Sequence, residues 1–175
     1  MRLYITEKPS QVVALKKVIK ENVLYAALAG HIIETYAPED YDKELSLSNW
    51  HKSVMAERYP FFPKEFKKKV KANSTFMMNG KKMVSDYKKK FEEAKSMIEK
   101  ATEIVLASDP DNEGVVLAME VVEACNASHK VIGMINMAKL DPSSLSKEVK
   151  TLDKIPYRKM NDAGNLRGVF DWLFG

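Results

Sequence analysis

One segment constrains the fold of this chain more than any other: an apolar run that leads into a cluster of carboxylates and then into a second apolar run. The first run is Ile104–Ala107, the acidic segment is Asp109-Pro-Asp-Asn-Glu-Gly114, and the second run begins at Val115. A short apolar run bounded by turn residues predicts a buried strand, and the longer run predicts a helix. The sequence therefore predicts a strand, an acidic turn and a helix, a unit typical of α/β folds.

Three carboxylates stand at alternate positions of this turn: Asp109, Asp111 and Glu113. On an extended segment, alternate residues point to the same side, so we expect these charges to repel one another and to bind a cation. Ligand sets made only of oxygen favour hard ions such as Mg²⁺ or Ca²⁺. Open α/β proteins place their sites at the carboxyl ends of strands. The turn is thus predicted to be a strand-end metal site.

A second polar group follows the predicted strand Arg2–Thr6, where Glu7 and Lys8 precede a helix that starts at Pro9. If this strand lies beside the one at 103–108, Glu7 comes close to Asp109 and Asp111. A carboxylate there can exchange protons, and an ammonium can stabilise charge on a phosphate. On their own the two residues would be an ordinary surface pair, and their position beside the acidic turn favours the functional interpretation.

The rest of the chain alternates between strand and helix patterns. Strands are expected at 23–29, 31–36 and 130–135, and helices at 9–20, 84–100, 115–126, 142–152 and from Pro156. A hairpin is expected at Asn79-Gly80 and an irregular segment at 37–50. This alternation predicts an α/β fold with a mostly parallel central sheet of about four strands flanked by helices.

Composition narrows the class of protein further. The chain has 175 residues, a net charge of +4 and a pI of about 9.0. Its lysine-dense segments, Lys64–Lys71 and Lys81–Lys90, fit either a solvated face or a nucleic-acid track. A single cysteine, Cys125, excludes an internal disulfide and a cysteine-rich zinc site. With no membrane-length apolar stretch and no secretory signal, a cytoplasmic protein is expected.

An EF-hand calcium loop is the main competing interpretation of the acidic turn, since Gly114 and Glu120 nearly complete that pattern. Pro110 is awkward inside such a loop, and the run before Asp109 is typical of a strand where an EF-hand needs a helix. The three histidines, His31, His51 and His129, show no ligand spacing and are expected to be structural or exposed.

Two motifs together resemble a known family. The segment from Met1 to Ser10 resembles the start of type IA DNA topoisomerases, particularly the topoisomerase III-like branch, and the segment from Asp109 to Gly114 resembles the D-x-D-x-E motif of their Toprim domain. Three further segments match the same family: 30–34, 37–42 and 165–175. The resemblance implies a Rossmann-like Toprim domain at 1–155, followed at 156–175 by the start of a helical domain.

The resemblance also implies a role for each site residue. Glu7 would be a general acid/base at the scissile phosphate, and Lys8 would stabilise the developing phosphoryl charge. Asp109, Asp111 and Glu113 would bind Mg²⁺. In this family a tyrosine attacks single-stranded DNA and becomes linked to its 5′ end, the other strand passes through, and religation follows.

This sequence departs from the family in three ways. The family usually has arginine where Asn112 stands and often has glutamate where Val115 stands. The nucleophilic tyrosine of the family lies in a separate domain far beyond residue 175. We therefore expect an N-terminal fragment that is inactive and monomeric alone and works with the remaining domains of a topoisomerase on single-stranded DNA. A free-standing Toprim nuclease using metal-activated water and a non-catalytic Ca²⁺- or DNA-binding module are the alternatives.

Overall fold

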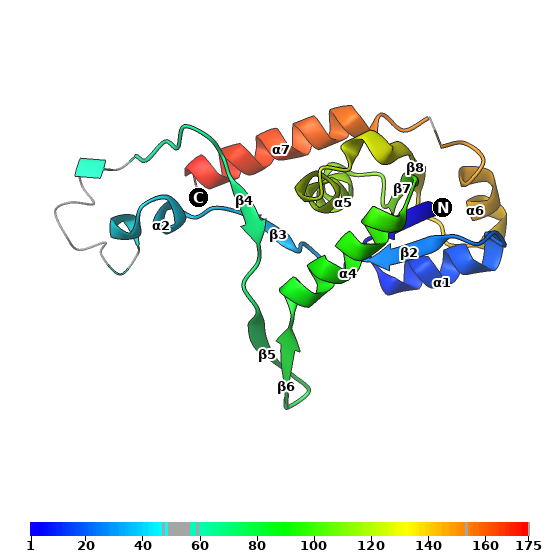
Figure 1. Ribbon diagram of the computed structural model, residues 1–175, viewed down its shortest axis with the longest axis horizontal. Coiled ribbons are helices and arrows are strands. Elements are labelled where there is room, and N and C mark those ends of the chain that lie inside the picture. Colours follow the sequence, from blue (N-terminus) through cyan, green and yellow to red (C-terminus); the bar gives the residue numbers. More distant parts are fainter. Residues whose placement is uncertain (47, 49–56, 59, 153, 175) are drawn as a thin grey trace.

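A parallel sheet of four strands forms the centre of the computed structural model, which describes residues 1–46, 48, 57–58, 60–152 and 154–174 (Figure 1). The spatial order of its strands is β2 (Leu24–Ala27), β1 (Arg2–Thr6), β7 (Glu103–Ser108) and β8 (Val131–Asn136). Both central strands are buried almost throughout, as expected of a parallel sheet covered on both faces. The predicted fold class is confirmed.

Helices cover both faces of this sheet, and alternation along β1 and β7 decides which side chains meet which helices. Leu3 and Ile5 pack into a cluster with α4 (Tyr87–Lys100) and α5 (Asn112–Ala124). Tyr4 faces the other way, toward α1 (Pro9–Val18) and α6 (Pro142–Glu148). The short η3 (Ser128–Lys130) connects α5 to β8. The result is a three-layer helix–sheet–helix core.

The final helix, α7 (Tyr157–Phe174), lies along α5 on the outside of this core (Figure 1). Gly164 permits the close approach, because a Cβ there would come within 2.4 Å of Val116 Cγ2. At its far end, the indole nitrogen of Trp172 donates a hydrogen bond of 2.8 Å to the carbonyl of Tyr36. The predicted helix after Pro156 is confirmed, whereas its assignment to a separate domain stays a prediction.

An excursion between β2 and α4 extends away from the sheet (Figure 1). It carries α2 (Pro38–Tyr41), η1 (Lys43–Leu45) and an antiparallel pair of β3 (Ile33–Thr35) with β4 (Lys68–Val70). The two short helices correct the prediction of an irregular segment for its described part; residues 47, 49 and 50 lie outside the described residues. No described helix is long and apolar enough to cross a membrane.

The excursion ends in the predicted hairpin, formed by β5 (Ser74–Met78) and β6 (Lys81–Ser85). Asn79 and Gly80 both have positive φ, 50° and 73°, as a type I′ turn requires. The helix predicted from Val84 begins only at Tyr87, because Val84 still pairs with Thr75 and the Asp86 side chain caps the helix by accepting from Lys89 N.

Candidate active site

The amino-terminal pair and the acidic turn lie together at one edge of the sheet. β1 and β7 are parallel neighbours in register, with Thr6 opposite Ala107, so both chains leave the sheet at the same end. Lys8 Nζ lies 3.2 Å from Asp109 Oδ2 and 3.3 Å from Glu7 Oε1. The predicted proximity of the two segments is therefore confirmed, although their chemical roles are not decided by it.

Gln11 fixes this arrangement, and it was not among the site residues predicted from the sequence. Its side-chain oxygen accepts a 2.9 Å hydrogen bond from Lys8 N, and its nitrogen donates to Asp109 Oδ1 at 3.4 Å. The residue is buried in the first turn of α1. Gln11 thus ties the start of α1 to the acidic turn of β7.

Lys8 is held in its charged form. The hydrogen bond to Asp109 raises the pKa of Lys8 above its ordinary value, and the hydrogen bond to Glu7 adds to the effect. About half of the lysine side chain is exposed, so its ammonium can also reach a ligand from solvent. An ammonium in this position is suited to an anionic group such as a phosphate.

Asp111 serves as the cap of α5. Its Oδ1 accepts a 2.7 Å hydrogen bond from Gly114 N, while its own N–H donates to the carbonyl of Asp109. The space around Gly114 is tight, since a Cβ there would lie 3.0 Å from that carbonyl and 3.2 Å from Asp111 Oδ1. A carboxylate in this position is stabilised by the helix N-terminus.

The three carboxylates do not line one side of an extended segment, and that part of the prediction is wrong. Glu113 lies in the first turn of α5. Side chains two positions apart on a helix do not point the same way, as they do on a strand. Its side chain is 81% exposed, and its Oε1 lies 3.9 Å from His31 Nε2. Asp109 therefore pairs with Lys8, Asp111 caps α5, and Glu113 extends toward His31.

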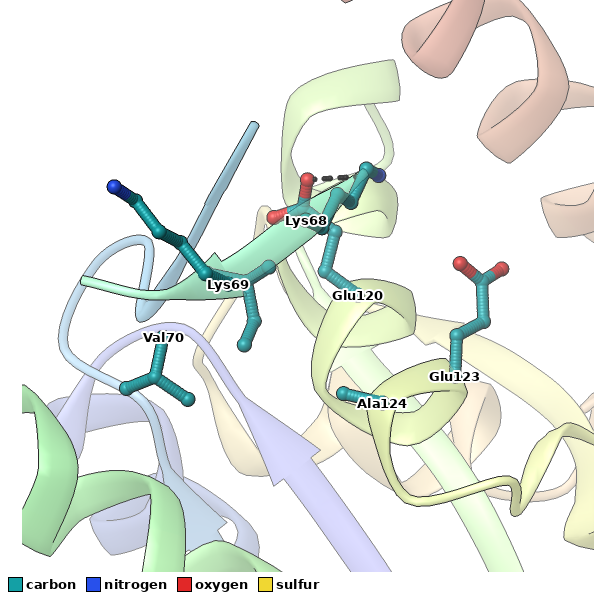
Figure 2. Close-up of a pocket in the computed structure, with 7 residues that line it drawn as sticks. Lys68, Lys69, Val70, Glu120, Glu123 and Ala124 are labelled. Carbon is teal, nitrogen blue, oxygen red and sulfur yellow. Dashed lines mark ion pairs between the residues drawn. The ribbon is translucent and has the colours of Figure 1, made fainter. Parts of the chain in front are cut away.

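His31 links the acidic turn to a buried charge. Positive φ angles at Ala29 (52°) and Gly30 (99°) turn the chain after β2, and His31 Nδ1 then lies 3.2 Å from Glu120 Oε2. Glu120 is almost fully buried, and Lys68 Nζ lies 3.0 Å from its other oxygen, the ion pair drawn in Figure 2. Sequence reasoning treated His31 as structural or exposed and missed this network.

The sequence profile of the Toprim domain matches residues 2–140. This chain belongs to the Toprim domain family.

Relatives of this Toprim domain are found in longer enzymes. The chain is 26% identical to DNA topoisomerase 3 of Haemophilus influenzae over 198 residues and 25% identical to DNA topoisomerase 3 of Pasteurella multocida, covering 100% of this chain and 27% of each relative. The full-length topoisomerase I of Thermotoga maritima has a similar fold, with a TM-score of 0.61 and 21% identity over 99% of this chain and 24% of that one. The chain thus spans about a quarter of the length of the proteins it matches.

The acidic turn of this Toprim domain has ligand atoms suited to a hard divalent cation, provided that one side chain rotates. Asp109, Asp111 and Glu113 offer only carboxylate oxygens, which suit Mg²⁺. Among the described residues, however, no three acidic, histidine or cysteine side chains already converge on one point. Glu113 would have to turn from His31 toward the two aspartates, a small rotamer cost for an exposed side chain.

The EF-hand interpretation fails within the Toprim fold. β7 occupies the position where an EF-hand needs its first helix, and Glu120, the residue expected to close the calcium loop, pairs with Lys68 and His31 inside the protein. The acidic turn is therefore a strand-to-helix connection.

Proposed function

We propose that this chain is the Toprim domain of a type IA DNA topoisomerase and supplies the acid–base and metal-binding half of its DNA cleavage and religation site. The observation that carries the proposal is the contact of Lys8 with both Glu7 and Asp109 at one sheet edge. The matches to DNA topoisomerase 3 support the assignment. The nucleophilic tyrosine would come from another domain of the same enzyme.

Each residue at the sheet edge has a distinct task in this proposal. Glu7 donates a proton to the 3′ oxygen that leaves when the tyrosine displaces it from phosphorus, and takes the proton back on religation. Lys8 holds the phosphate through its ammonium while charge builds on the phosphoryl oxygens.

Asp109, Asp111 and Glu113 would hold Mg²⁺, which supplies positive charge near the DNA backbone when bound. Asp111 is already oriented by its hydrogen bond from Gly114 N, and Gln11 and Lys8 restrain Asp109. The partners of the domain would be single-stranded DNA and the remaining domains of the enzyme, in a cytoplasmic setting.

Relaxation of supercoiled plasmid by the protein expressed from the complete reading frame tests this proposal. Glu7→Gln is expected to slow Mg²⁺-dependent relaxation by about 100-fold or more, the usual contribution of a positioned acid–base group. Glu21→Gln, which alters an exposed glutamate just after α1, is the matched control and should relax at the unaltered rate. Full relaxation by Glu7→Gln, or relaxation by residues 1–175 alone, would contradict the proposal.

A free-standing nuclease is the second candidate, and the same acidic turn favours it, because metal-activated water needs no tyrosine. Nicking of plasmid by residues 1–175 that disappears in Asp111→Ala would support the nuclease and exclude the topoisomerase fragment. We expect no nicking.

A further inference from the structure

The β5–β6 hairpin exposes more apolar surface than a solvated ribbon requires. It stands out from the body of the molecule between β4 and α4 (Figure 1). Phe76 is 46% exposed, Met77 67%, Met83 39% and Val84 62%. Clustered exposure of large apolar side chains marks an interaction surface more often than chance.

Strand register distributes these side chains over both faces of the hairpin. Phe76 lies opposite Met83, and Thr75 lies opposite Val84, so the two pairs point to opposite faces. Neither face can therefore be explained as one that packs on the protein core. A two-stranded hairpin is marginally stable alone, and an external partner would bury what the chain itself leaves exposed.

The charge around the hairpin identifies the chemistry of that partner. Residues 66–85 contain six lysines and no acidic residue. Lys68 and Lys69 are neutralised by Glu120 and Asp40. Within the described part of the chain, Lys81 and Lys82 have no acidic partner in an ion pair, so the tip of the hairpin carries uncompensated positive charge that a polyanion would complement.

We propose that the β5–β6 hairpin binds single-stranded nucleic acid, with Phe76 against the face of a base and Lys81, on the same face of the hairpin, at a phosphate. A duplex hides its base faces, whereas a single strand offers them to aromatic and apolar side chains beside its charged backbone. The proposal rests on the proposed function in taking DNA as the partner. It adds a binding surface that contains none of the sheet-edge residues.

Binding of a fluorescent oligothymidylate to the 175-residue chain, followed by anisotropy, tests the proposal. Lys81→Glu should weaken binding and reduce the slope of log K against log salt by about 0.7, the contribution of one contact with a single-strand phosphate. Phe76→Ser should weaken binding about fivefold or more, whereas Phe76→Trp, which keeps an aromatic face, should bind as tightly as the unaltered chain. The matched control, Lys17→Glu, makes the same charge change at an exposed position of α1, which packs on the opposite face of the sheet from α4.

The outcomes separate this proposal from the proposed function. Equal weakening by the hairpin and control lysine variants, or unchanged affinity in Phe76→Ser, would overturn the hairpin proposal and leave the sheet-edge site untouched. If Phe76→Ser instead converts an oligomer into a monomer on light scattering without altering DNA affinity, the hairpin is a protein-docking surface and the proposal is wrong. Asp111→Asn should abolish relaxation by the complete enzyme but leave the contribution of the hairpin to DNA binding intact. If the unaltered complete enzyme shows hairpin-dependent binding but no relaxation activity, only the proposed function is refuted.

Discussion

At the scale of single residues, the site depends on side chains that tertiary structure brings together. Glu7, Lys8 and the acidic turn could be predicted, because each follows a recognisable strand and the carboxyl ends of neighbouring parallel strands meet. The contact of Gln11 with Asp109 and the contact of His31 with Glu120 could not be predicted. They join positions 98 and 89 residues apart in the chain, and no local spacing reports such a contact.

The buried Glu120 gives a residue-scale prediction. Glu120→Gln removes the charge that Lys68 and His31 face, and should lower the free energy of unfolding by about 1–3 kcal/mol, as expected for a hydrogen-bonded buried charge. In a double-mutant cycle measured by urea unfolding, Lys68→Met and Glu120→Gln should show a coupling energy of about 0.5 kcal/mol or more.

The control for that cycle is the exposed pair of Arg167 and Asp171, one helical turn apart on α7. Asp171→Asn should change the free energy of unfolding by less than about 0.5 kcal/mol, since exposed pairs contribute little. Additive effects of Lys68→Met and Glu120→Gln would show that the ion pair in Figure 2 is absent in solution.

At the scale of elements, the spacing of apolar residues and the residue types at turns predicted most of the fold. The four strands of the sheet and the Asn79-Gly80 turn follow from apolar runs and a turn dipeptide. The boundary between β6 and α4 was placed too early because Val84 is apolar and suits both the end of a strand and the start of a helix. Only its pairing with Thr75 decides between them.

The contact of α7 with α5 gives an element-scale prediction. Gly164→Ala should destabilise the protein by about 1–3 kcal/mol, because the new methyl would meet Val116, a stiff branched side chain. Gly168→Ala is the matched control on the same helix: a Cβ there has no atom within 4 Å among the described residues, and the better helix propensity should stabilise the protein by about 0.5–1 kcal/mol. Thermal or urea unfolding measures both, and equal effects would contradict the close packing of the two helices.

At the scale of the whole molecule, the chain is a Toprim domain whose sheet edge carries the candidate chemistry and whose hairpin carries an exposed basic and apolar surface. The fold and the meeting of the two polar segments were accessible from sequence. The position of Glu113 was not, because the extended geometry assumed for the turn gives way to the first turn of α5. Its use as a metal ligand requires a side-chain movement that sequence cannot report.

Paramagnetic broadening by Mn²⁺, a substitute for Mg²⁺, tests most directly whether the sheet edge is one cation site. In the ¹H–¹⁵N spectrum of the 175-residue chain, substoichiometric Mn²⁺ should broaden the amide signals of Lys8 and Gly114 together, and Asp111→Ala should remove both effects. Broadening that spares Lys8, or that persists unchanged in Asp111→Ala, would show that the two segments do not share a metal site.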